Sequence, residues 1–115
     1  EYHTKGTFYE IDKDGNKSTR IVGDNYEVVA GSDFVNIKGT ANLTIDSNCN
    51  TYIKGNWNIQ VDGTKTEVVT GAVSETYKST KTENVTGAVQ ETFSSTQTTN
   101  VSSNVTITGS RIDLN

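Results

Sequence analysis

The 115-residue chain contains no proline, no methionine and a single cysteine, Cys49. One cysteine excludes a framework of intrachain disulfides, and the absence of proline leaves extended backbone uninterrupted. Only 31% of the residues are hydrophobic, against a usual ~45–50% by a count that includes glycine. One such chain is not expected to offset its conformational entropy alone. The composition therefore indicates either disorder or a core shared between chains.

Charge and hydropathy exclude further classes of protein. The net charge is −4 and the acidic residues are spread along the chain, whereas nucleic-acid binding needs clustered lysine and arginine. No apolar run approaches the ~18 residues that span a bilayer, and no signal-peptide pattern opens the chain. We find no catalytic constellation or phosphate-binding loop, so we expect no enzyme activity. His3, the only histidine, is expected to be solvated.

The chain has glycine instead, and the glycines recur with a period of eight. Eight of the ten glycines share one register, beginning at Gly15. Serine fills four vacant register positions, at Ser47, Ser79, Ser95 and Ser103. A strict repeat argues against disorder and therefore favours an oligomer. The register glycines that we predict to form corners of the fold are Gly23, Gly31, Gly39, Gly55, Gly63, Gly71 and Gly87.

From Gly23 to Ser103, the position two residues before each register site is always β-branched or aromatic. In a strand, side chains an even number of residues apart share a face. This position is therefore the candidate for the inward, core-forming side chain. Its members are Ile21, Val29, Ile37, Ile45, Ile53, Val61, Val69, Tyr77, Val85, Phe93 and Val101.

The repeat predicts a fold made of three chains. A corner every eight residues calls for backbone angles or a close approach that a Cβ atom would oppose. Eight extended residues span roughly 26 Å, which is too wide for one chain to coil into a filled solenoid. We therefore predict an all-β fold, an intertwined triple-stranded β-helix that forms a homotrimeric triangular prism after short antiparallel strands. The predicted parts are residues 1–30, a hairpin and meander; 31–108, the octapeptide repeat; and 109–115, a C-terminal tip.

The first part has the pattern of a hairpin. Strands are expected over 7–11 and 19–22, and Asp14-Gly15 predicts a tight turn between them. A further strand over 25–29 would continue the meander. Because the chain begins close to a strand-like segment, we also expect it to belong to a longer protein.

Acidic residues change the filling of the predicted shaft in its second half. Four glutamates lie eight residues apart on the same side as the apolar positions: Glu67, Glu75, Glu83 and Glu91. Buried charges must be paired, hydrogen-bonded or ion-bound. One interpretation places carboxylate rings inside the shaft, holding cations or water and pairing with Lys65 and Lys81 of neighbouring chains. The other places the carboxylates at solvated corners, and both stay open.

In earlier octads the position four residues before the register site, which the glutamates occupy later, is mostly apolar. These octads carry Val35, Leu43 and Ile59 there, and Cys49 and Trp57 fall at another inward offset. We expect a packed core at this level, with an enclosed acyl chain as the alternative. No cofactor is required by either interpretation.

The sequence resembles a known family. The Val/Ile-x-Gly octads, the Trp57-containing run 55–63 and the terminal Gly-Ser-Arg-Ile-Asp-Leu at 109–114 are similar to the C-terminal β-helical needle of the central baseplate spike protein of T-even-type contractile-tailed phages. The hairpin resembles the segment where that needle begins. The valine–glycine-repeat spikes of type VI secretion share the octads, but the C-terminal residues favour the phage family.

The resemblance implies a structural homotrimer on the virion tail baseplate, driven through the host outer membrane and into the periplasm when the sheath contracts. It also implies attachment to a baseplate hub through a preceding part of the protein, where the family has a lysozyme domain. A PAAR-type tip protein would contact the C-terminal residues Ser110, Arg111, Ile112, Asp113 and Leu114. The alternatives are a receptor-binding fibre tip or adhesin, or a type VI secretion spike, on the same β-helix.

Overall fold

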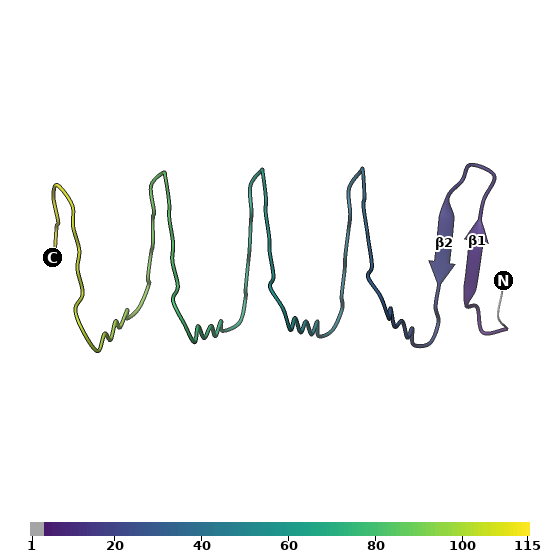
Figure 1. The fold of residues 1–115 in the computed structure, drawn as a ribbon, viewed down its shortest axis with the longest axis horizontal. Helices are drawn as coiled ribbons and strands as arrows, with labels where there is room; N and C mark the ends of the chain where they lie inside the picture. The colour runs from purple at the N-terminus through teal and green to yellow at the C-terminus, as the bar shows by residue number, and fades with distance from the viewer. Residues whose placement is uncertain (1–3) are drawn as a thin grey trace. The chain divides into compact units, whose positions relative to one another are not determined.

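A computed structural model describes residues 4–115, so His3 lies outside the described residues. This part of the chain is all-β: it has two strands, β1 (Phe8–Ile11) and β2 (Lys17–Arg20), and no helix. The strands pair antiparallel, with Phe8 opposite Arg20 and Ile11 opposite Lys17 (Figure 1). The predicted hairpin is therefore confirmed, although β2 begins two residues earlier than expected.

The turn between the strands is longer than the two-residue turn that Asp14-Gly15 predicts. The Asp12 amide donates to the Asn16 carbonyl at 3.0 Å, and the Gly15 amide donates to the Asp12 carbonyl at 3.2 Å. Gly15 has φ +83°. A turn closed in this way and followed by a left-handed glycine is the three-residue hairpin loop. The glycine is thus used for its left-handed backbone, one position later than in a two-residue turn.

Beyond the hairpin the backbone is extended and bends at regular intervals. Each bend occupies a register position and the residue before it, whether that position holds glycine or serine. A bend at Ser110 continues the spacing of eight, although Gly109 is out of register. The bends lie at 22–23, 30–31, 38–39, 46–47, 54–55, 62–63, 70–71, 78–79, 86–87, 94–95, 102–103 and 110.

The extended segments do not pair with one another. Within residues 24–115 there is no strand and no backbone–backbone hydrogen bond. The strand expected over 25–29 is therefore wrong for the single chain: this segment is extended but unpaired. A solenoid of one chain would join each turn to the next by hydrogen bonds, so the described residues do not form one.

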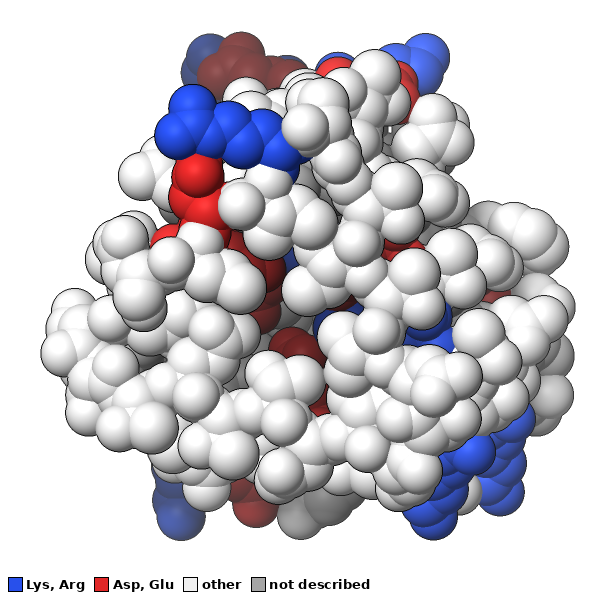
Figure 2. Space-filling model, turned by 90° about the vertical axis from the view of Figure 1, so that its left-hand side faces the viewer, with Lys and Arg blue, Asp and Glu red and all other residues white. Residues whose placement is uncertain are grey.

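The described residues also lack a core. None of residues 4–115 is buried, and only Gly6, Thr7 and Phe8 are half-buried. The accessible surface is 12983 Å², whereas a compact monomer of 12.5 kDa exposes about 6,200 Å². Charged side chains of both signs and many uncharged ones share the surface that Figure 2 shows. The large apolar side chains are therefore exposed to solvent, because no other part of the chain packs against them.

Contacts divide the chain into two units, Glu1–Asn58 and Ile59–Asn115. The first contains the hairpin and several octads, and the second contains the remaining octads and the C-terminal tail. Within each unit the trace follows a repeated up-and-down path (Figure 1). Residues 4–115 include no helix that is long and apolar enough to cross a membrane.

Candidate functional site: a periodic apolar face and its corners

Exposure separates the apolar side chains that lie two residues before a register position from the large apolar side chains of the opposite parity. Between residues 24 and 108, the side chains two residues before a register position are exposed by 43% (Ile53) to 58% (Val85). Large apolar side chains of the opposite parity are exposed by 84% to 92%, and they are Tyr26, Val28, Phe34, Tyr52 and Val68. The first group lies next to a bend and is about half exposed, whereas the second group is almost fully exposed. The repeat therefore builds one apolar face along both units.

Inward side chains farther from the bend have a larger exposed fraction. On the inward side, Ile59 is exposed by 62% and Leu43 by 85%, and both lie four residues before a register position. Trp57 and Cys49, predicted to be buried, are also exposed in the single chain. These side chains have no neighbour within the chain that could cover them.

The predicted corner glycines all lie at bends, but their backbone differs from the expectation. Positive φ occurs only at Gly6 and Gly15 within residues 4–115. A Cβ atom added at any of the seven predicted corners would meet no atom within 4 Å. Serine adopts the same bend at Ser47 and Ser79. The left-handed explanation of the corner glycines is therefore wrong, and the chain by itself supplies no close approach that requires them.

Glutamates of the predicted series contact side chains that lie two residues away in the same chain. Lys65 Nζ lies 3.4 Å from Glu67 Oε2, and Lys81 Nζ lies 2.8 Å from Glu83 Oε1. Both ion pairs lie within one chain, and pairing of these lysines with neighbouring chains stays a prediction. Residues i and i+2 share a side of an extended segment, so each pair lies on one side.

Aromatic contacts connect this series to the apolar face. The Tyr77 hydroxyl donates to Glu75 Oε2 at 3.4 Å, and Lys81 Nζ lies 5.0 Å from the centre of the Tyr77 ring. The hydrogen bond between Lys81 and Glu83 and their opposite charges raise the pKa of the lysine and lower the pKa of the carboxyl. The glutamates thus share a side with Tyr77, a member of the apolar face.

One chain does not bring the four glutamates together. They lie one octad apart, roughly 26 Å of extended backbone, and the described residues include no group of three metal-ligating side chains. Carboxylate rings would need several chains. Both interpretations of the series, inward rings and solvated corners, remain predictions.

The tail predicted to contact a tip protein is exposed. Arg111 Nε donates to Asp113 Oδ1 at 2.9 Å, while Ile112 and Leu114 are open to solvent. At Gly109, unlike at the register glycines, an added Cβ would lie 3.4 Å from the Arg111 carbonyl oxygen. The tail therefore has its own local backbone constraint.

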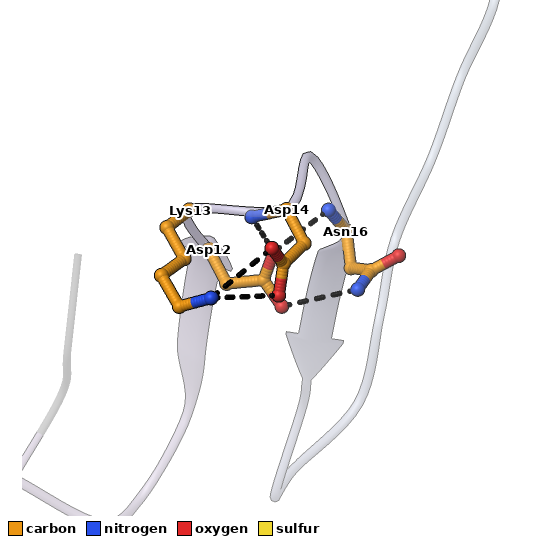
Figure 3. A network of polar contacts seen from close by, with 4 residues as sticks. All are labelled: Asp12, Lys13, Asp14 and Asn16. Atoms are coloured by element: carbon orange, nitrogen blue, oxygen red, sulfur yellow. Dashed lines mark hydrogen bonds and ion pairs between the residues drawn. The ribbon is translucent and has the colours of Figure 1, made fainter.

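The hairpin turn holds the densest polar network that the sequence did not single out (Figure 3). The Asp12 carboxylate accepts the Asp14 and Asn16 amides, both at 2.9 Å, and the Asn16 side-chain amide at 3.2 Å. The bonds from Asn16 lead the causes that lower the pKa of Asp12 below its ordinary value of 3.8. An aspartate at the first position of a turn is the signal for this arrangement.

A hollow lies against the base of the hairpin. Its walls include Phe8, Tyr9, Ile21 and Val22. The Val22 amide donates to Thr7 Oγ1 at 3.1 Å, which ties the two ends of the hairpin together. The mainly apolar walls form another surface that the single chain leaves uncovered.

Periodic bends, one apolar face and unpaired backbone define a class of repetitive all-β chain whose bonding groups are open to other chains. Over 51 residues this chain is 43% identical to Protein Gp5 of Vibrio phage KVP40 (isolate Vibrio parahaemolyticus/Japan/Matsuzaki/1991). The matched segment is 44% of this chain and 12% of that phage protein, so it spans about an eighth of the relative. No family model matches the chain. No solved structure matches it either.

Proposed function

We propose that this chain is a structural part of a contractile phage tail, a trimeric needle on the baseplate spike that pierces the host outer membrane. The observation that carries the proposal is an octad-periodic backbone with no internal hydrogen bond between octads. The similarity to the phage protein Gp5 supports the viral context.

The unpaired backbone amides and carbonyls of the octads are the reason to expect assembly with other copies. Backbone amides and carbonyls that are withdrawn from water must be paired, and residues 24–115 offer theirs along both edges of every segment. The surface exceeds that of a compact monomer of this mass by a factor of about two, as the 12983 Å² of accessible area shows. Other copies of the same sequence match the repeat octad for octad. Three copies fill a prism whose faces are each one octad wide.

The corner glycines fit the same assembly. Nothing in one chain approaches the seven predicted positions within 4 Å of an added Cβ. In an intertwined trimer, backbone of the other copies passes above and below each bend at the ~4.8 Å spacing of paired strands. Glycine at these positions then has the close neighbours that the single chain lacks.

Rigidity is the mechanical property that this architecture supplies. Every segment is hydrogen-bonded above and below to other copies, so the shaft has no hinge. Unfolding requires three chains to disentangle, so stability is expected to be kinetic. The outward side chains are mainly threonine, asparagine, lysine and aspartate, which suit passage through a membrane better than anchoring in it.

The remaining partners belong to the same proposal. The preceding part of a longer protein would attach the needle to the baseplate hub. The tail with Arg111 and Asp113 would seat a PAAR-type tip protein, and the needle tip would reach the outer membrane and periplasm. We propose no catalytic role and no required cofactor for this chain. Ions, water or an acyl chain in the shaft remain predictions.

A second candidate is a receptor-binding fibre tip. Outward aromatic side chains favour it, because Phe34 and Tyr52 are exposed by 91% and 84%. Aromatic rings on a polar surface are suited to binding sugar rings or protein partners. A type VI secretion spike would share the physics of the needle and differ in the machine that launches it.

Two measurements test the proposal. Light scattering of the purified chain should give a trimer, and unboiled samples on an SDS gel should migrate as a resistant trimer. A monomer in light scattering would overturn the architecture. An array of bacterial surface glycans should show negligible binding; binding that is lost when Phe34 and Tyr52 are both replaced by serine would favour the fibre tip instead.

A further inference from the structure

The residue just before each register position carries a pattern of charge. This residue is the first of the two that bend, and its parity is opposite to that of the apolar face. In four successive octads its sign alternates between positive and negative. We call this set the corner charge series: Lys38, Asp46, Lys54 and Asp62.

The single chain does not use this alternation. Lys38, Asp46 and Lys54 make no ion pair or hydrogen bond within the described residues, and Asp62 accepts only from Gln60 Nε2, at 2.8 Å. Successive members are one octad apart, roughly 26 Å of extended chain. An ion pair between neighbours of the series along one chain is therefore out of reach.

The proposed trimer brings the series together. By three-fold symmetry the same octad of each copy lies at one level, one on each face of the prism. Each copy advances by one face per octad, so the segment stacked on a given octad is the next octad of another copy. Because the stacked segments are parallel and in register, Lys38 of one copy lies beside Asp46 of the second. Asp46 of the second copy then lies beside Lys54 of the third.

We propose that the corner charge series forms a ladder of intermolecular ion pairs along each of the three edges of the shaft. Stacked strands lie 4.7–4.9 Å apart, which is within reach of lysine and aspartate. Opposite charges facing each other across strands stabilise a sheet and like charges destabilise it. The ladder therefore favours the order in which consecutive octads of different copies stack. A slip by one octad would place like charges side by side.

This inference rests on the proposed trimer but goes beyond it, because an intertwined β-helix does not require alternating corner charges. The second half of the chain supplies the contrast. There, Lys78 occupies the same position, and its neighbours in the series are Thr70 and Thr86. The chain thus contains a matched lysine outside the ladder.

The test compares one charge reversal inside the ladder with one outside it. Lys54→Asp places three aspartates in succession along every edge, whereas Lys78→Asp places an aspartate between two threonines. We expect Lys54→Asp to lower the melting temperature of the trimer by several degrees at low salt and by less in high salt, where exposed charges are screened. Lys78→Asp should leave the melting temperature almost unchanged.

A fully inverted series provides the rescue. The variant Lys38→Asp, Asp46→Lys, Lys54→Asp, Asp62→Lys restores alternation with every sign reversed, and it should recover most of the lost melting temperature. Equal effects of Lys54→Asp and Lys78→Asp, or failure of the inverted series to recover, would overturn the ladder while leaving the trimer standing. A monomeric wild-type chain would overturn the trimer and the ladder together.

Discussion

The hairpin and the octads solve the same problem of backbone hydrogen bonding in opposite ways. Strands β1 and β2 pair with each other, and the Asp12 carboxylate closes the loop between them. The octads, which are rich in threonine, valine and asparagine, satisfy none of their backbone groups internally. Adjacent strands joined by a short turn can pair within one chain. Segments that turn a corner every eight residues leave their backbone edges unpaired within the chain.

The largest test of this contrast introduces a charge into the apolar face. Val61→Asp would place an unpaired carboxylate in the interior of the trimer in every copy, at a cost on the order of several kcal/mol each. We expect no SDS-resistant trimer and a monomer or aggregate in size-exclusion chromatography.

Val68→Asp is the matched control, because Val68 lies on the outward side and is already 85% exposed. This variant should assemble like the wild type. If both variants assembled equally well, the apolar face would have no role in assembly.

Replacing a corner glycine by alanine should have opposite effects on stability in a single chain and in a trimer. With open space around Gly63, alanine would stabilise a lone chain by about 0.4–1 kcal/mol through its less flexible unfolded state. In the trimer, neighbouring backbone should oppose the added Cβ, so we expect Gly63→Ala to lower the melting temperature.

The sign of this shift is decisive. Ser103→Ala, at a register position that already carries a Cβ, should be close to neutral in the same measurement. A rise in melting temperature for Gly63→Ala would contradict close packing at the corners.

The hairpin should respond to changes that leave the octads untouched. Asp12→Ala removes the acceptor of three hydrogen bonds, and we expect faster hydrogen exchange of the amides in residues 8–20. The melting temperature of the shaft should be unchanged. Asp14→Ala, which removes only an exposed contact with Lys13, should alter exchange less.

The smallest expected effect is the pH dependence of the same turn. Because the pKa of Asp12 in the folded hairpin lies below its ordinary value of 3.8, its stabilising contribution is fully present above pH 3.8. It is lost as the pH falls through the lower, folded value. Hydrogen exchange in the hairpin should therefore accelerate below pH 3.8 relative to the octads, after correction for intrinsic rates. The Asp12→Ala variant should show no such difference.

The sequence predicted the hairpin, its approximate strands and the position of every bend from Gly23 to Ser103. These features follow from local chemistry: β-branched residues, the aspartate-glycine turn and an eight-residue register. It did not predict the longer loop, because the carboxylate of Asp12 competes with the two-residue turn. Of the two reasons offered for the corner glycines, backbone angles or a close approach that a Cβ atom would oppose, the first is not borne out, because positive φ within residues 4–115 occurs only at Gly6 and Gly15.

Sequence by itself therefore determined where this chain bends and which side of each segment is apolar, since both depend on residue type and parity alone. The tertiary structure decided two further points. The glycines at the bends from Gly23 to Gly87 do not have positive φ, and the described segments do not stack on one another as a solenoid of one chain. Pairing depends on which segments come within hydrogen-bonding distance, and a periodic pattern is compatible with pairing inside a chain or between chains. Residues 24–115 make no backbone–backbone hydrogen bond within the chain, a fact that the periodic sequence alone does not determine.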